Sequence, residues 1–353
     1  MTPEQARKAA LDLQAECDRA VQSKKPPDGW QKSQERISAL AAQMKNTFVE
    51  RFDAVDAILA ALISRAGCVL LGPPGTAKSL LVREVARACE LVTSGDSANY
   101  FEYLLTPHTM PEEIFGPTDI GLLLQAPPSV QRRTLGRLPY AELAFLDEVF
   151  RGGSHILNTL LTILNERKFH NGQNTEDVPL IGFIGAANLP PQADEFKAFF
   201  DRFPVRIWVD TVLSGAQPVE NATRLLESHR RTSLPPQDAK VRPSMRDFRV
   251  LNATLRIKVG MPVAGDDRLK EFTSNFRSFQ SVGQLSDRAF VQLWYFAAAL
   301  DMLKGKGCEH SGYAKDGRGH YECFRFVAPN QAARKEVDYA VRQLQLRAGV
   351  TGS

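Results

Sequence analysis

Residues 70–81, LLGPPGTAKSLL, nearly match the phosphate-loop pattern G-x-x-x-x-G-K-[ST], whose backbone N–H groups surround nucleotide phosphates. In this pattern Lys78 reaches the β- and γ-phosphates, and the Ser79 hydroxyl ligates Mg²⁺. The one mismatch is Ala77, where the pattern has glycine, and the alternative is a tight Pro-Gly turn before a helix. The residues expected to hold the nucleotide are Gly72, Pro73, Pro74, Gly75, Thr76, Ala77, Lys78, Ser79 and Leu80.

Two adjacent carboxylates end the apolar segment ELAFLDE at 142–148. Parallel sheets bind ligands at the carboxyl ends of their strands, so this placement favours a catalytic pair. We expect Asp147 to hold Mg²⁺ through its water shell and Glu148 to polarise the attacking water as general base. The alternative is a helix cap, because acidic residues suit helix N-termini.

A carboxamide ends the next apolar segment, LIGFIGAAN, at Asn188. Its side chain both donates and accepts hydrogen bonds, so it suits contact with a γ-phosphate or with the attacking water. An asparagine in this position also forms turns readily, which is the alternative interpretation.

Two arginines are candidates for contact with a transferred phosphoryl group. Arg202, in FFDRFPVRIWVD at 199–210, is placed to project to the nucleotide of a neighbouring subunit, with Arg206 as the weaker candidate and an exposed helix end as the alternative. Arg288 follows Ser286, a predicted N-cap. An arginine is unfavourable in the first turn of a helix, which suggests that it reaches the γ-phosphate from a helical region.

Apolar segments and helical periodicity alternate through the part of the chain that carries these residues. Helices are expected at 54–67, from the phosphate loop to about Glu90, and at 154–168. This alternation predicts an α/β fold with a parallel sheet covered by helices on both sides. The expected strands are 68–72, 100–105, 142–148, 180–188 and 204–210.

The two ends of the chain are predicted to be helical. Helices at 3–22 and 30–46 form an N-terminal extension, read either as a solvated addition or as a partner-binding arm. After a proline-containing junction, helices without strands predict a smaller domain. These helices are expected at 219–230, 243–258, 267–280, 286–303 and about 330–346. The resulting division is 1–45, 46–212 and 213–353.

The composition excludes several classes of protein. The net charge is +4, from 44 basic and 40 acidic residues, which gives no strong signal for nucleic acid. Five scattered cysteines do not make a disulfide framework, and no apolar run has the length of a membrane helix. The first residues are charged and lack a secretion signal, so we expect a cytoplasmic protein.

One cluster in the C-terminal tail is compatible with a metal site. The segment CEHSGYAKDGRGHYEC contains Cys308, His310, His320 and Cys323, which could hold zinc tetrahedrally. The spacing is not a standard one, and Gly-rich polar loops also carry such residues by chance.

Four segments together resemble the MoxR family of AAA+ ATPases, in particular its RavA branch, in which alanine commonly stands at the place of Ala77. They are TPHTMPEEIFGPTDI (106–120), LDEVFRGGSHILNTLLTILNERKFHNG (146–172), ANLPP and DRFPVRIWVD. The resemblance implies an αβα core with a five-stranded sheet of order 5-1-4-3-2, a small all-helical lid, and ATP with Mg²⁺ as ligands. It assigns Walker A to Lys78 and Ser79, Walker B to Asp147 and Glu148, sensor 1 to Asn188, the arginine finger to Arg202 and sensor 2 to Arg288.

The resemblance also implies an assembly and a partner. Members typically form hexamers, remodel proteins in a chaperone-like way and work with a protein that has a von Willebrand factor A domain. Residues 119–140 stand where the family's helix-2 insert belongs, with Arg132, Arg133 and Arg137 as its expected charged tip; a solvated basic loop is the alternative. Residues 1–45 and the tail from 304 depart from the RavA pattern, so functions of RavA's long C-terminal part are not carried over.

The leading hypothesis is therefore a ring-forming ATPase that remodels or activates a protein partner. Two alternatives stay open from the sequence: a nucleotide-switched scaffold with slow turnover, and a nucleic-acid motor. The balanced charge argues against the motor.

Overall fold

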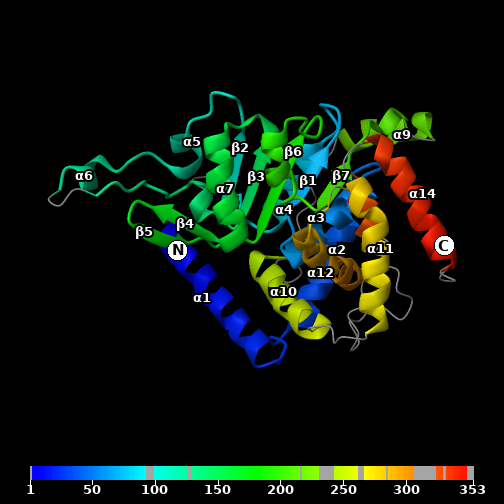
Figure 1. The fold of residues 1–353 in the computed structure, drawn as a ribbon, viewed down its shortest axis with the longest axis horizontal. Helices are drawn as coiled ribbons and strands as arrows, with labels where there is room; N and C mark the ends of the chain where they lie inside the picture. The colour runs from blue at the N-terminus through cyan, green and yellow to red at the C-terminus, as the bar shows by residue number, and fades with distance from the viewer. Residues whose placement is uncertain are drawn as a thin grey trace.

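A central sheet of five parallel strands organises the chain (Figure 1). The computed structural model describes residues 2–92, 99–125, 129–214, 217–229, 242–260, 266–283, 285–304, 323–328 and 331–347. The strands are β1 (Cys68–Leu71), β2 (Tyr100–Leu104), β3 (Leu143–Asp147), β6 (Gly182–Ala187) and β7 (Val205–Trp208). Their order is β2-β3-β6-β1-β7, which is 5-1-4-3-2 when the five are numbered along the chain. Both the expected sheet and its order are confirmed.

Helices cover both faces of this sheet. They are α3 (Phe52–Ser64), α4 (Lys78–Ala88), α5 (Pro111–Phe115), α7 (Ser154–Glu166) and α8 (Lys197–Phe200), whereas the short helix α6 (Ile120–Leu123) lies away from the sheet. Alternate residues of β1 enter two separate hydrophobic clusters, because successive side chains of a strand point to opposite faces. Leu70 packs with residues of α3 and α4, whereas Val69 and Leu71 pack with residues of α7 and α8. The sheet is therefore the middle layer of an αβα sandwich.

The first two helices differ in how they pack. In α2 (Trp30–Thr47), Ile37, Leu40, Ala41 and Met44 are at most 5% exposed and join the cluster that contains α3. The expectation of a solvated extension is thus wrong for α2, because the apolar face read from its periodicity is covered. Helix α1 (Pro3–Gln22) buries fewer of its side chains and packs along α10. Its Arg7 also forms an ion pair with Glu176 at 3.0 Å.

The C-terminal helices share the core of the N-terminal ones. They are α10 (Met245–Val259), α11 (Asp267–Gly283), α12 (Asp287–Leu303) and α14 (Gln331–Arg347), whereas α9 (Pro218–His229) contributes none of its described side chains to that core. Helix α12 packs on α3, and α10 packs on α1, α2 and α3 (Figure 1). The domain boundaries at 45 and 212 stay a prediction. Among the residues described, no helix combines the length and the apolar character needed to cross a membrane.

A two-stranded hairpin, β4 (Lys168–Asn171) and β5 (Asn174–Asp177), was not expected from the sequence. Its two-residue turn has Gly172 at the first position with φ 64°, a conformation that glycine adopts without a steric cost. The turn signal is present in the sequence as Asn-Gly, but the segment carries too little apolar alternation to read as strands.

Residues 117–125 and 129–133 form an arm that projects from the body and carries α6 (Figure 1). Its two sides meet at an antiparallel bridge between Thr118 and Arg132. The expected charged tip is wrong, because all three arginines bind residues that come before α6 in the chain. Arg132 donates to the Gly116 carbonyl at 2.8 Å, Arg133 pairs with Asp119 at 2.9 Å, and Arg137 donates to the Glu113 carbonyl at 2.9 Å. The outer part of the arm instead exposes Ile120 and Leu124.

The burial of α2 predicts a specific loss of stability. Leu40→Ala should lower the free energy of unfolding by about 2–4 kcal/mol, because it opens a cavity between α2 and α3. Urea unfolding followed by circular dichroism measures this, with exposed Glu35→Ala in the same helix as the control, expected within about 0.5 kcal/mol of the unsubstituted chain. Equal, small effects of both changes would contradict a packed α2.

Candidate functional site

Three neighbouring strands, β3, β6 and β1, end at the same edge of the sheet. In the register, Leu71 of β1 pairs with Ala187 of β6, and Leu146 of β3 pairs with Gly185. The phosphate loop, the carboxylate pair and Asn188 directly follow these strand ends. Five residues predicted from separate segments therefore meet at one site: Lys78, Ser79, Asp147, Glu148 and Asn188.

The phosphate loop has the backbone that its sequence pattern requires. Gly72 and Gly75 have φ of 141° and 78°, and a Cβ on Gly72 would lie 2.2 Å from the Val209 carbonyl oxygen. Ala77, the mismatched residue, also lies in the left-handed region, with φ 67° and ψ 22°, and is the N-cap of α4. The alanine thus adopts the conformation that glycine would favour, at a cost of about 1–2 kcal/mol.

The two predicted metal ligands are in direct contact. The Ser79 hydroxyl donates to Asp147 Oδ2 at 2.9 Å, and the other carboxylate oxygen accepts the Glu148 N–H at 2.9 Å. A hydroxyl beside a carboxylate is a hard oxygen pair of the kind Mg²⁺ prefers, with room left for water ligands. The donor set therefore fits this ion.

Glu148 is held by two side chains. Asn188 Nδ2 donates to Glu148 Oε1 at 2.7 Å, and Arg151 Nε lies 3.4 Å from Oε2. The carboxylate is thereby fixed in direction while it remains accessible from the sheet edge. Arg151 was not predicted, since a basic residue three positions after an acidic one is common on any short helical turn.

The side chain of Lys78 folds back over the loop that it follows. Its ammonium donates to the Gly72 and Pro73 carbonyls at 2.7 and 2.8 Å. Burial lowers the pKa of Lys78, and the nearby carboxylates of Asp147 and Glu148 act in the opposite direction. Its position beside the loop N–H groups matches a phosphate-binding role.

Arg202 lies at the other edge of the sheet. Its carbonyl oxygen is so close to Gly67, at the amino end of β1, that a Cβ there would be 1.9 Å away. The phosphate loop begins five residues further on, which corresponds to roughly 16 Å along an extended strand. Arg202 therefore lies too far from the phosphate loop of its own chain to contact a nucleotide bound there.

Arg288 lies close enough to Arg202 for their charges to interact. Its guanidinium donates to Asn165 Oδ1 at 3.1 Å at the end of α7, while Arg202 pairs with Asp201 at 3.2 Å. Burial lowers the pKa of Arg202, and the positive charge of Arg288 lowers it further. The structure thus brings the two arginines together, away from the other five predicted residues. Arg206, the weaker candidate, is buried over the Phe200 ring and donates to the Phe203 carbonyl.

A pocket of about 590 Å³ adjoins the phosphate loop. It is lined by the residues before α3, the loop itself and the chain after β7, together with Leu80 and Glu84 of α4 and Leu225 of α9. Its lining from these segments includes Thr47, Phe48, Val49, Gly75, Thr76, Ala77, Thr211, Val212 and Leu213. Such a mixed wall beside a phosphate site suits a flat ring system. No local motif marks the lining residues outside the phosphate loop and α4, so the sequence analysis missed those residues.

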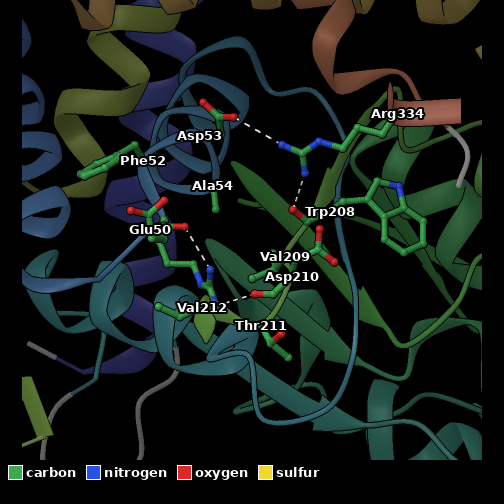
Figure 2. Close-up of a pocket in the computed structure, with 11 residues that line it drawn as sticks. Glu50, Phe52, Asp53, Ala54, Trp208, Val209, Asp210, Thr211, Val212 and Arg334 are labelled. Carbon is green, nitrogen blue, oxygen red and sulfur yellow. Dashed lines mark hydrogen bonds and ion pairs between the residues drawn. The ribbon is translucent and has the colours of Figure 1, made fainter. Parts of the chain in front are cut away.

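A second pocket, of about 320 Å³, lies between the start of α3, the end of β7 and α14 (Figure 2). Arg334 reaches into it from α14, donating to the Trp208 carbonyl at 2.6 Å and lying 3.5 Å from the Asp53 carboxylate. Arg51 contributes to the walls of both pockets.

The tail residues proposed for zinc fall largely outside the described part of the chain. Cys308, His310 and His320 lie there, and Cys323 is buried in a short 3-10 helix, η5 (Cys323–Phe326). Within the ranges that the structure describes, no group of three or more His, Cys, Asp or Glu residues could hold a metal.

Known proteins match this chain in sequence and in structure. The family model described as the MoxR domain in the MoxR-vWA-beta-propeller ternary systems matches residues 35–238. The uncharacterized proteins MJ0812 and MJ0079 of Methanocaldococcus jannaschii are each 42% identical over 54% of the chain. These matches span about half of each relative, 48% and 47% of their lengths.

Two further matches are more distant. Structural protein ORF618 of Acidianus two-tailed virus is 32% identical over 49% of the chain and 28% of that protein. A crystal structure from Cytophaga hutchinsonii, named "putative ATPase", superimposes with a TM-score of 0.61 at 16% identity, covering 90% of this chain and 94% of that one. At this identity the likeness shows the fold alone.

The left-handed backbone at position 77 predicts the effect of restoring glycine. Ala77→Gly should raise the free energy of unfolding by about 0.5–1 kcal/mol, because relief of the left-handed strain exceeds the entropy cost of glycine. Thermal melting measures this against Ala39→Gly on the exposed face of α2, where glycine should lower stability by about 1 kcal/mol. Equal losses in the two variants would contradict the left-handed conformation.

Proposed function

Because the chain belongs to the family of MoxR domains of MoxR-vWA-beta-propeller systems, we propose that it is an AAA+ ATPase that hydrolyses Mg²⁺·ATP in a ring. One observation carries this proposal: the continuous set of contacts from Ser79 through Asp147 and Glu148 to Asn188. Each of the groups that phosphoryl transfer to water requires is present in this set or beside it in the phosphate loop.

In the proposed binding mode, the phosphates lie against the N–H groups of the loop and the N-terminus of α4. Lys78 supplies positive charge to the β- and γ-phosphates. The base and ribose occupy the pocket of about 590 Å³ between Phe48, Leu213 and Leu225. This pocket adjoins the loop at Gly75 and Ala77, so a single nucleotide spans both parts.

In the proposed reaction, Glu148 accepts the proton of the attacking water. Asn188 fixes the direction of that carboxylate through the 2.7 Å hydrogen bond and is placed to contact the γ-phosphate or the water itself. Ser79 and Asp147 would hold Mg²⁺, which neutralises charge on the phosphate oxygens. In this proposal one chain supplies the residues that would hold the metal ion, orient the attacking water and accept its proton.

Arg202 and Arg288 act on the nucleotide of a neighbouring subunit in this proposal. Both lie at the edge of the sheet opposite the phosphate loop, so a ring that places this edge against the next subunit's site would use them together. A guanidinium there stabilises charge that develops on the transferred phosphoryl group. The resemblance to MoxR proteins favours six subunits.

The proposed partner is a protein with a von Willebrand factor A domain. The description of the matched family, MoxR domains of MoxR-vWA-beta-propeller systems, supports this partner class. ATP turnover would then remodel or activate that partner in a chaperone-like way. Assignment to the RavA branch rests on the sequence resemblance around Ala77 and stays a prediction.

Replacing the proposed general base separates binding from hydrolysis. Glu148→Gln should bind ATP with an affinity within about threefold of the unsubstituted chain, yet lose turnover by about 10²–10⁴-fold, because the amide cannot accept the proton. Phosphate release and a fluorescent-nucleotide titration measure the two effects. Exposed Glu16→Gln on α1 is the control and should turn over normally. Normal turnover of Glu148→Gln would contradict the role of Glu148.

Mixing variants tests action between subunits. Arg202→Ala and Arg288→Ala should each keep nucleotide affinity and lose turnover, by about 10³-fold for Arg202. Adding an inactive Lys78→Ala chain, whose arginines are intact, should restore part of the turnover of either variant, because each ring then contains complete composite sites. Loss of ATP affinity in Arg288→Ala, or no recovery on mixing, would refute the arrangement.

A further inference from the structure

Arg51 is a buried cation whose hydrogen bonds go to three backbone carbonyls. It lies at the N-cap of α3 and is 7% exposed. Its Nε donates to Thr76 at 3.2 Å, Nη1 to Glu50 at 3.0 Å and Nη2 to Asp210 at 2.8 Å. One guanidinium therefore joins the phosphate loop, the segment before α3 and the end of β7.

The contact with Thr76 constrains the peptide that follows it. In a trans peptide the carbonyl oxygen of Thr76 and the N–H of Ala77 point in opposite directions. A donor that holds this carbonyl therefore fixes the direction of the Ala77 N–H. The Thr76 hydroxyl, which donates to the Pro73 carbonyl at 2.9 Å, restrains the same residue within the loop.

The contact with Asp210 extends the constraint to the end of β7. Arg334 of α14 donates to the Trp208 carbonyl, and carbonyls two residues apart in an extended chain point the same way. Figure 2 shows Trp208, Asp210 and Arg334 around the second pocket, between α3, β7 and α14. Asp53 lies on the far side of the Arg334 guanidinium. The end of the strand is thus anchored independently by α14, which gives Arg51 a fixed point from which to hold the loop.

A buried arginine is a poor choice for stability alone. Burial lowers the pKa of Arg51, while the charges of Asp210 and Glu50 act in the opposite direction. Taking a charge out of water carries a free-energy cost that well-packed apolar side chains of similar size avoid. The donors of Arg51 therefore have a use that an apolar side chain in the same space could not supply.

On the basis of the proposed ATP-binding function, we propose that Arg51 is a positioning residue for the nucleotide phosphates. It turns the Thr76 carbonyl toward itself and so directs the Ala77 N–H toward the phosphates. It thereby holds the left-handed backbone at a position where alanine replaces glycine. Arg51 does this through the loop, without touching the reacting atoms.

The test compares ligands that differ only in phosphate. Arg51→Met keeps the length of the side chain and removes its donors. It should weaken binding of ATP and ADP at least tenfold, because the loop N–H groups lose their direction, and change adenosine binding less than twofold. Competition against a fluorescent nucleotide measures all three. In turnover, KM for ATP should rise about as much, while kcat changes by less than about threefold.

Arg206→Met is the matched control. Arg206 is also buried, at 2% exposed, and also donates to backbone carbonyls, of Phe203 at 2.9 Å and Val327 at 3.3 Å, but at the amino end of β7. Its loss should lower the melting temperature without changing affinity for ATP or ADP. Arg51→Lys retains one donor group and should give an intermediate loss of ATP affinity.

Each alternative outcome has a distinct meaning. Equal weakening of adenosine and ATP would overturn the proposal, since Arg51 would then act only as a wall of the base pocket. Unchanged ATP affinity in Arg51→Met would overturn it alone and leave the proposed ATPase intact. Failure of the unsubstituted chain to bind ATP would overturn both. If Arg51→Met does not fold, Arg51→Lys decides, and full ATP affinity in that variant overturns the proposal.

Discussion

The hydrogen bond between Ser79 and Asp147 spans the end of β6, because Ser79 follows β1 and Asp147 ends β3. This strand separates β1 from β3, so its residues determine whether side chains can meet above it. Gly185 near its end leaves space for Val149, whose Cγ1 would lie 2.9 Å from an added Cβ, and Gly182 leaves space for Leu62. Small residues at these positions explain the composition of LIGFIGAAN. They allow the segment after Asp147 to fold back against the sheet, which places Glu148 beside Asn188.

The length of the strands separates Arg202 and Arg288, at the amino ends, from the other five predicted residues, at the carboxyl ends. Arg202 and Arg288 are like charges that repel each other; burial, and to a smaller extent the charge of Arg288, lower the pKa of Arg202. Asp201 offsets part of this repulsion by pairing with Arg202. The Ser286 hydroxyl donates to the same carboxylate at 2.8 Å and so helps to hold it there. On the proposed function, the phosphates of a neighbouring nucleotide would offset the rest. The like charge that destabilises the isolated chain would then favour the assembled ring with nucleotide bound.

The sequence predicts best those features that a short continuous segment determines by itself. Strands β3 and β6 are apolar runs that lead directly into predicted site residues, so Asp147, Glu148 and Asn188 could be placed without knowledge of packing. Arg51 and the walls of the proposed base pocket outside the phosphate loop could not be placed, because their roles depend on segments that only the fold brings together. The apolar face of α2 was visible, but periodicity does not reveal whether a face is covered. The arginines of the arm were misplaced because charge alone does not distinguish a tip from a base.

Backbone strain gives independent support for the location of the site. Among the described residues, seven other than glycine have positive φ. Four of them follow or cap the ends of helices, where a left-handed residue is common: Lys24, Arg65, Glu90 and Arg167. Of the other three, Ala77 and Glu148 belong to the candidate site and Glu50 lines the second pocket, and each costs of order 1 kcal/mol or more. Arg51 binds the carbonyls of Glu50 and Thr76, and Asn188 binds the side chain of Glu148. The strained positions are therefore those where polar contacts converge, which is expected where geometry serves a ligand rather than the stability of the fold.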